Sequence, residues 1–279
     1  MSWAVWLTGV PGSGKSTLAR AVADRLAGMG QSVTVLELDR MRRFVTPAPT
    51  SSDAERDVVY RALVWVAASL TEAGLPVVID ATAHRRQWRD LARAVIPRFA
   101  EVHVTCPLEV ATTREQRRRG GAAPPGIYAR AGRPGARVPG IDVPYEPPLA
   151  PDLVVDGAGE PIDRAAERVT AMALGLAGAG AHPAPADRWV IWITGRPGSG
   201  KSTLACGAAE RLQSDGIPIK LLAFADLRAL LAPGYTPPAA DEILHRAVIY
   251  AARLLTRAGV AVIVDATAPR LAWRPGCAP

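Results

Sequence analysis

Cysteine is scarce in this chain, with only three in 279 residues. Cys106, Cys206 and Cys277 lie too far apart along the sequence to form a metal cluster, and their number is odd. A reducing, cytoplasmic environment fits this cysteine usage best.

Long apolar runs are also absent. No stretch reaches the ~18 residues that a membrane span requires, and no signal peptide opens the chain. The apolar content of 49% is typical of a globular protein rather than a disordered one. We therefore expect a cytoplasmic protein with no membrane partner, and 279 residues allow two modest domains.

Lysine is the rarest of the charged residues. The chain has 33 basic residues, of which only Lys15, Lys201 and Lys220 are lysines. The net charge of +7 suggests an anionic ligand or a nucleic acid. Arginine-rich, lysine-poor usage is also typical of a GC-rich genome, which raises the charge without a functional reason. No helix-turn-helix, zinc finger or RNP-like string is visible, so nucleic acid is not expected as the main partner.

Two of the three lysines lie in glycine-rich loops of the form G-x-x-x-x-G-K-[ST], the P-loop motif. The first loop follows an apolar run, 3–8, and precedes a helical pattern, 18–26. In this context backbone N–H groups surround an anion, the lysine reaches the β- and γ-phosphates of ATP, and the serine ligates Mg²⁺. The predicted nucleotide-binding residues of this loop are Gly9, Pro11, Gly12, Ser13, Gly14, Lys15, Ser16 and Thr17, with Ser16 as a metal ligand.

Strand-like and helix-like segments alternate along residues 1–176. This alternation predicts an α/β, P-loop NTPase three-layer fold with a parallel sheet. The expected strands cover 3–8, 32–38, 75–80, 100–105 and 153–155. The expected helices cover 18–26, 53–72, a segment ending near 95, 110–119 and 162–176. The Gly/Pro-rich stretch 120–151 has little regular pattern.

The pattern then begins again after a linker, 177–187. Residues 188–279 repeat the apolar run, the P-loop and the third strand, so we expect a duplicated P-loop domain. The second copy has no counterpart of 100–176. A truncated or frame-shifted reading frame would explain this difference, and so would an accessory half-domain. We expect it to bind phosphates without independent turnover, through Gly195, Gly198, Ser199, Gly200, Lys201, Ser202 and Thr203.

Two carboxylates end predicted strands, where doubly wound sheets place ligand groups. We interpret Asp39 as the base or orienting group for the phosphoryl acceptor, with a helix N-cap as the alternative. Asp80 follows four apolar residues, as a Walker B aspartate that acts on Mg²⁺ does. The alternative for Asp80 is a strand-terminal cap.

Basic residues around these carboxylates are candidates for binding anions. Arg42, Arg56 and Arg61 could hold an anionic acceptor, and Thr82 could touch acceptor or phosphate. Arg114 begins the basic run 114–119, which is either a solvated helix face or a lid whose arginine neutralises the charge on the transferred phosphoryl group. For each arginine alone, a solvated surface role is the alternative.

Several segments of residues 1–176 resemble the adenylylsulfate kinase family. They are the P-loop string WLTGVPGSGKSTLA, then LELDRMR, CPLEVATTR and GIYARA, and finally PGIDVPYEPPLAPDLVVD. The resemblance implies a cytoplasmic Mg²⁺- and ATP-dependent kinase of the 3′-hydroxyl of adenylyl sulfate, active in sulfate assimilation. It also implies a small-molecule partner and a possible homodimer. By the same resemblance Lys15, Asp39 and Arg114 are catalytic, and Arg42, Arg56 and Arg61 bind the acceptor.

The chain departs from the family pattern at a few positions. Glu37 replaces the first aspartate of L-D-G-D, Val59 replaces an asparagine and Pro125 a lysine. The aromatic of F-T-G is Val138, and a second aromatic before Arg56 is missing. Phosphate handling is thus kept better than adenine recognition. This leaves open a kinase of another small alcohol or a polynucleotide end, or a nucleotide-binding regulatory module with little turnover.

Overall fold

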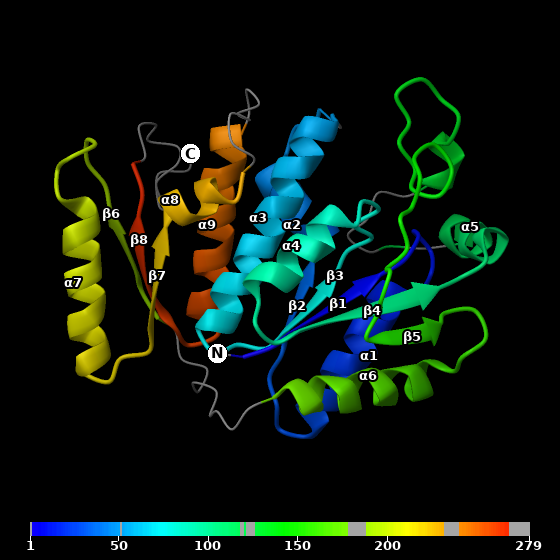
Figure 1. Cartoon of the computed structure of the whole chain (residues 1–279), viewed down its shortest axis with the longest axis horizontal. Helices are drawn as coiled ribbons and strands as arrows, with labels where there is room; N and C mark the ends of the chain where they lie inside the picture. The colour runs from blue at the N-terminus through cyan, green and yellow to red at the C-terminus, as the bar shows by residue number, and fades with distance from the viewer. Residues whose placement is uncertain are drawn as a thin grey trace. The chain divides into compact units, whose positions relative to one another are not determined.

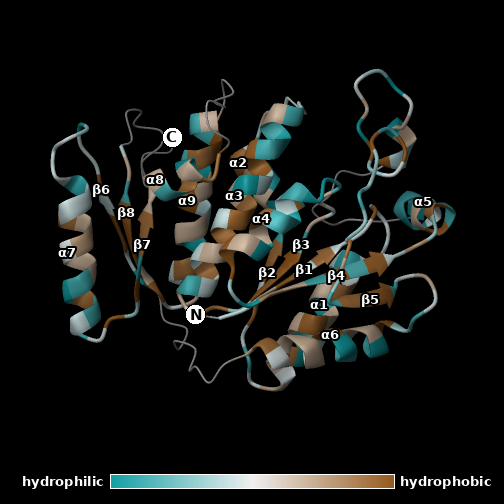
Figure 2. Ribbon diagram, in the orientation of Figure 1, coloured by the Kyte–Doolittle hydropathy of each residue, from teal (hydrophilic) through white to brown (hydrophobic). Residues whose placement is uncertain are grey.

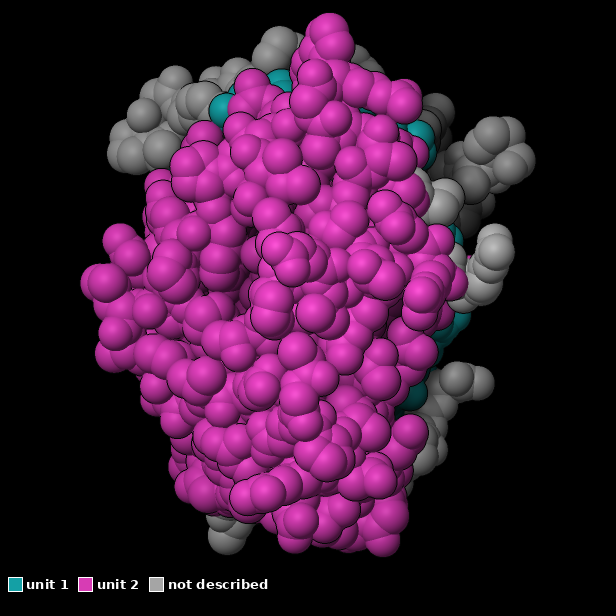
Figure 3. Space-filling model, turned by 90° about the vertical axis from the view of Figure 1, so that its right-hand side faces the viewer, with its two compact units in different colours: residues 1, 41–74, 181–279 teal, residues 2–40, 75–180 magenta. Residues whose placement is uncertain are grey.

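The computed structural model describes residues 2–50, 52–117, 120, 126–177, 188–231 and 240–267. The chain divides into two compact units. Unit 1 comprises residues 1, 41–74 and 181–279, and unit 2 comprises 2–40 and 75–180. Figure 3 shows the surface of unit 2. The predicted linker lies, from residue 178 on, outside the described residues, and the predicted domain boundaries stay a prediction.

Unit 2 is built on a five-stranded sheet of order β2-β3-β1-β4-β5, with parallel pairing throughout (Figure 1). Its strands are β1 (Ala4–Thr8), β2 (Thr34–Glu37), β3 (Val77–Asp80), β4 (Phe99–Thr105) and β5 (Leu153–Asp156). Its helices are α1 (Lys15–Gly28), α4 (Gln87–Val95), α5 (Leu108–Arg117), α6 (Ile162–Leu176) and the 3₁₀ turn η1 (Tyr128–Arg130). The predicted α/β fold with a parallel sheet is confirmed.

The core of unit 2 explains why the first strand is apolar at every position but its last. All five residues of β1 are buried, because helices cover both faces of a central parallel strand. Val5 and Leu7 pack in one cluster with α1 and α6, on the lower face of the sheet in Figure 1. Trp6 faces the other way, where its indole N–H donates to the Ala81 carbonyl at 2.9 Å. Figure 2 shows these strands as the most hydrophobic elements.

The second strand is shorter than its sequence pattern indicates. β2 ends at Glu37, and α2 (Leu38–Val45) begins at the next residue. Asp39 therefore lies in the first turn of a helix rather than at the end of a strand. A carboxylate in this position is stabilised by the partial positive charge of the helix N-terminus.

Unit 1 contains a three-stranded parallel sheet of order β6-β8-β7. Its strands are β6 (Val190–Ile193), β7 (Ile219–Ala223) and β8 (Ala261–Asp265), and its helices are α3 (Asp53–Glu72), α7 (Lys201–Ser214), α8 (Phe224–Ala229) and α9 (Ala240–Arg257). If the strands of each sheet are numbered in chain order, β6-β8-β7 is the same spatial order as β1-β3-β2 of unit 2. No helix in the described parts of the chain is long and apolar enough to cross a membrane.

A buried ion pair joins α4 to the sheet of unit 2. Arg89 is fully buried, and its Nε lies 2.5 Å from Glu101 Oε1 on β4. The Arg89 guanidinium also donates to the carbonyls of Ala83 and Glu146. Burial raises the pKa of Glu101, and the positive charge of Arg89 opposes that rise. Arg89 thus links α4 to β4 and to the loops that contain Ala83 and Glu146.

We expect Arg89→Met to lower the free energy of unfolding by about 3–5 kcal/mol, because it removes the buried counter-ion of Glu101 and leaves only the half-exposed Arg93, 3.8 Å away. Urea denaturation measures this change. Arg25→Met is the matched control, since Arg25 lies on the surface with its partner Glu167 3.5 Å away. The control should lose less than about 1 kcal/mol. Equal losses in both variants would show that the buried pair has no special role.

Candidate active site

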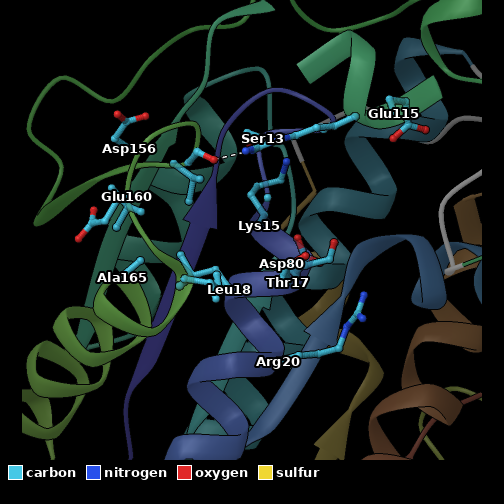
Figure 4. A pocket seen from close by; sticks show the side chains of 18 of the residues that line it. Ser13, Lys15, Thr17, Leu18, Arg20, Asp80, Glu115, Asp156, Glu160 and Ala165 are labelled. Carbon is cyan, nitrogen blue, oxygen red and sulfur yellow. Dashed lines mark hydrogen bonds between the residues drawn. The ribbon is translucent and has the colours of Figure 1, made fainter. Parts of the chain in front are cut away.

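A cavity of about 720 Å³ lies at the carboxyl ends of the strands of unit 2 (Figure 4). Ligand sites of open α/β sheets lie at this edge. The lining comes from the glycine loop, the first turns of α1 and α2, the ends of β2 and β3, α5, and the loop after β5. Of the predicted site residues, the cavity brings together Gly12–Thr17, Asp39, Asp80 and Arg114.

The glycine loop has the shape that its sequence predicts. Gly14 is the N-cap of α1 with φ 102°, a conformation that favours glycine. Lys15 is buried, and its Nζ donates to the carbonyls of Gly9 at 3.0 Å and Val10 at 2.9 Å. The Tyr128 hydroxyl donates to the carbonyl of Pro11 at 2.7 Å. The loop is thus closed around the lysine, with its N–H groups and the N-terminus of α1 at the cavity.

Gly12 is required by packing as well as by its φ of 79°. A methyl carbon at this position would overlap the backbone carbonyl of Ala111 in α5. The clash cannot be relieved by rotating a side chain, because the added carbon is bonded directly to Cα and the carbonyl belongs to the backbone.

We expect Gly12→Ala to displace the loop from α5 and to weaken ATP binding at least about tenfold, because oriented loop N–H groups carry the phosphate affinity. Calorimetric titration with ATP measures this effect. Gly28→Ala is the control, since a methyl group there meets nothing within 4 Å. Unchanged ATP affinity in Gly12→Ala would contradict the packing argument.

The ammonium of Lys15 lies in an acidic surrounding. Burial lowers the pKa of Lys15, and the nearby charges of Asp80, Asp39 and Glu115 act in the opposite direction. Figure 4 shows Lys15 between the loop and Asp80, with Glu115 on one side and Asp156 and Glu160 on the other. The carboxylates favour the charged form of the lysine, and an incoming polyphosphate would do the same.

Carboxylates gather where β2 and β3 end. Glu37 and Asp80 are partners in the register of these strands, and Asp39 follows in the first turn of α2. Ser16 lies in the first turn of α1 and is exposed at the cavity. Hydroxyl and carboxylate oxygens are the ligands that Mg²⁺ prefers, so Ser16 and Asp80 form a donor set that fits this ion.

The wall opposite these carboxylates is formed by α5 and the loop after β5. Arg114 lines the cavity, and its guanidinium donates to the carbonyl of Gly157 at 2.5 Å and to that of Ala158 at 3.5 Å. Gly157 approaches the glycine loop so closely that a methyl group on it would overlap the Ser13 carbonyl. Arg114 is thus held over the loop by backbone contacts.

Several lining residues were given no role from the sequence. They are Arg20, Glu37, Glu115, Arg117, Asp156, Gly157 and Glu160. Glu37 and Asp156 could have been found, because each follows directly on the apolar residues of a strand that ends at this edge. Glu115 lies in a run of arginines whose pattern indicates a solvated face, yet its side chain is buried.

The other predicted acceptor residues are not among the described residues that line the cavity. Thr82 does not line the cavity as far as the described residues define it, and its carbonyl accepts a hydrogen bond from Thr8 Oγ1 at 2.7 Å. Arg42, Arg56 and Arg61 belong to unit 1. Their role in binding an acceptor stays a prediction.

The segment 138–148 is fastened at several points. Asp142 accepts hydrogen bonds from the backbone N–H groups of Gly132 and Val138, each at 2.8 Å. The Tyr145 hydroxyl lies 3.0 Å from Thr8 Oγ1, and Glu146 accepts from the N–H of Arg86 at 2.6 Å. The acidic and aromatic residues of the string GIDVPYE therefore hold this loop against the sheet.

The second glycine loop repeats the first. Gly200 is the N-cap of α7 with φ 80°, and α7 begins at Lys201 as α1 begins at Lys15. Lys201 Nζ donates to the carbonyl of Arg196 at 2.9 Å. The loop residues Gly198–Thr203 are exposed or half-buried, whereas the first loop lies in a cavity. Whether Gly195, Gly198 and Ser199–Thr203 bind a nucleotide stays a prediction.

The adenylylsulphate kinase family model matches two segments of the chain, residues 1–156 and 187–278. The chain belongs to the adenylylsulphate kinase family. That the second segment is a truncated copy of the first stays a prediction.

Relatives within the adenylylsulphate kinase family share about a third of their residues with this chain. The probable adenylyl-sulfate kinase of Archaeoglobus fulgidus is 37% identical over 157 residues, which are 56% of this chain and 96% of the relative. That of Pyrococcus abyssi is 36% identical over 59% of this chain and 91% of the relative. The solved APS kinase of Mycobacterium tuberculosis, in complex with AMPPNP and APS, is 33% identical with a TM-score of 0.54, covering 61% of this chain and 96% of that one.

Proposed function

We propose that this protein transfers the γ-phosphoryl group of ATP to the 3′-hydroxyl of adenylyl sulfate, giving 3′-phosphoadenylyl sulfate for sulfate assimilation. The observation that carries the proposal is the cavity in which the family's P-loop, Asp39 and Arg114 come together. The Mycobacterium tuberculosis enzyme, whose complex holds AMPPNP and APS, supports ATP and adenylyl sulfate as the two ligands.

The glycine loop holds the phosphates of ATP. Backbone N–H groups of residues 12–17 and the N-terminus of α1 surround the phosphate oxygens, and Lys15 neutralises the β- and γ-phosphates. Lys15 then exchanges its hydrogen bonds to the Gly9 and Val10 carbonyls for bonds to phosphate oxygens. Arg114 lies across the cavity on α5, where its guanidinium stabilises the charge that develops on the transferred group.

Mg²⁺ fits the oxygen donors at the cavity edge. Ser16 would hold it directly and Asp80 through water, and Glu37 adds a third oxygen donor to that edge. When bound, the ion supplies neutralisation of charge on the β- and γ-phosphates. The chain's own residues orient the phosphates and the acceptor.

Asp39 orients the acceptor. Its carboxylate lies in the first turn of α2, at the edge of the cavity that holds Lys15. A hydroxyl of the acceptor that donates to Asp39 is directed at the γ-phosphate and loses its proton to that carboxylate. Arg42, Arg56, Arg61 and Thr82 are the proposed contacts of the anionic acceptor.

The proposal is tested by ADP release from Mg-ATP with and without adenylyl sulfate. Release is expected to depend strongly on adenylyl sulfate and to be lost in Lys15→Met. ATP binding without stimulation by adenylyl sulfate would contradict that substrate. Val138 and the missing second aromatic favour another hydroxyl acceptor in that case, and a panel of small alcohols and polynucleotide ends would identify it.

A further inference from the structure

Two arginines in unit 1 make equivalent contacts, each with an acid on its own helix and with a backbone carbonyl of the other segment. Arg61 lies on α3 and Arg246 on α9, at corresponding positions of the repeated pattern. Each pairs with an acid four residues earlier on its own helix. Arg61 Nε donates to Asp57 at 2.7 Å, and Arg246 Nε donates to Glu242 at 3.1 Å.

Each arginine also reaches across to the other repeat. Arg61 Nη1 donates to the carbonyl of Leu230 at 2.7 Å, and Arg246 Nη1 donates to the carbonyl of Phe44 at 3.4 Å. Phe44 and Leu230 correspond as well, since each lies 29 residues after the lysine of its own glycine loop. The contact from the first repeat to the second is thus repeated from the second to the first. Such reciprocity is the property of a two-fold interface between like subunits.

Packing around these hydrogen bonds is extensive. Helices α3 and α9 lie side by side, and both bury most of their apolar residues (Figure 1). The ring of Phe44 lies 5.7 Å from that of Tyr250, between centroids, and the Arg253 guanidinium lies 5.4 Å above the Phe44 ring. Aromatic pairs and cation–π contacts of this kind stabilise beyond the area they bury.

We propose that the second P-loop segment, residues 188–267, is the two-fold partner of the first repeat within one chain, and that it positions α2 for catalysis. Helix α2 connects these contacts to the active site, because it contains both Phe44 and Asp39. α2 carries Asp39 in its first turn and Phe44 near its end, where Tyr250, Arg246 and Arg253 hold it. An eight-residue helix is not stable alone and needs tertiary contacts.

Arg61 joins α3 to the second segment in addition to its proposed contact with the acceptor. Its Nε donates to Asp57 and its Nη1 donates to the Leu230 carbonyl. Tyr250 and Arg246 are positioning residues, because they act on Asp39 only through α2. The catalytic part of this inference rests on the proposed function, whereas the structural part does not.

Two variants test the inference, Tyr250→Ala and Arg246→Ala. Hydrogen exchange read by mass spectrometry is expected to show exchange at residues 38–45 at least about tenfold faster in both. Exchange in α1 should not change, which shows that unit 2 stays folded. Tyr250→Phe keeps the ring and should restore slow exchange. Arg211→Ala is the matched control, since Arg211 forms an exposed pair with Asp215 four residues away on α7.

Kinetics form the second readout. KM for adenylyl sulfate is expected to rise about tenfold in Tyr250→Ala and Arg246→Ala, with KM for ATP within about threefold of the wild-type value. Sedimentation should give the 29.4 kDa mass of one chain, because α9 already covers α3. A dimer that α3 mutations dissociate would overturn the assignment of the partner to the same chain.

The two proposals fail in different ways. If the wild type releases no ADP with adenylyl sulfate, the proposed function fails, and hydrogen exchange still decides whether residues 188–267 hold α2. If exchange at 38–45 is the same in Tyr250→Ala, Arg246→Ala and Arg211→Ala, the positioning role is overturned whatever the activity.

Discussion

Lys15→Met is expected to lower kcat/KM for ATP by about a hundredfold to a thousandfold, the effect of removing one preorganised charge from a phosphoryl-transfer site. The lysine is buried in the glycine loop, and no other lysine lies within the first repeat. An arginine cannot replace it, because a planar guanidinium does not fit where a compact ammonium does. ADP release at saturating adenylyl sulfate measures the loss.

The same variant separates catalysis from stability. Burial holds the pKa of Lys15 below its usual value of 10.5, so the unfolded chain binds this proton more tightly than the folded one. The free energy of unfolding of the wild type therefore rises with pH from the lowered pKa up to 10.5, and Lys15→Met removes that rise. Because methionine removes the cost of burying this amine, the variant should have an equal or higher melting temperature without ATP.

Arg25→Met is the control for Lys15→Met, because Arg25 lies on the same helix and its side chain is 39% exposed. It should leave both activity and melting temperature unchanged. A loss of activity in Lys15→Met that comes with a clearly lower melting temperature would point to misfolding and contradict the assigned role. Activity near that of the wild type would remove Lys15 from the mechanism.

Asp39→Asn is expected to lower kcat about a hundredfold or more, as the loss of a general base does. Asparagine keeps the shape of the side chain and removes only its charge and proton affinity. KM for ATP should change less than about threefold, because the glycine loop that binds the phosphates is untouched. Initial rates over a range of adenylyl sulfate and ATP concentrations separate the two effects.

Two further carboxylates serve as controls for Asp39→Asn. Asp24→Asn changes an exposed side chain on α1 and should have no effect. Glu37→Gln changes a neighbour in the same cavity and is expected to raise the Mg²⁺ requirement rather than to abolish turnover. A kcat in Asp39→Asn within about threefold of the wild-type value would show that positioning alone suffices.

The sequence predicts the sheet of unit 2 well, because its strands are short apolar runs between clear helical patterns. Four predicted strands agree with β1, β3, β4 and β5 to within two residues at either end. The apolar pattern predicts that the second strand ends at Leu38, although β2 ends at Glu37. Leu38 fits a buried strand and a buried helix equally well, so apolar character alone could not locate the boundary.

The sequence predicts the parts of the site that belong to local motifs. It does not predict the parts that only the folding of distant segments brings together. The glycine loop, Asp80 and Arg114 were found from spacing, and the cavity brings them together. Gly157 and Glu115 join the site through contacts between distant segments, which no local pattern contains. The reciprocal contacts of Arg61 and Arg246 were missed for the same reason, since they depend on how α3 packs against α9.

The cross-contacts of Arg61 and Arg246 have one consequence for how this chain can change over evolutionary time. Both arginines donate to main-chain carbonyls, which every residue type presents. These hydrogen bonds therefore place no requirement on the side chains at positions 44 and 230, which are phenylalanine and leucine. In the proposed two-fold arrangement, one chain also fixes the local concentration of the two segments at about the millimolar level. In that arrangement, substitutions that would separate two free subunits on dilution can be tolerated, because the chain keeps both sides of the interface together.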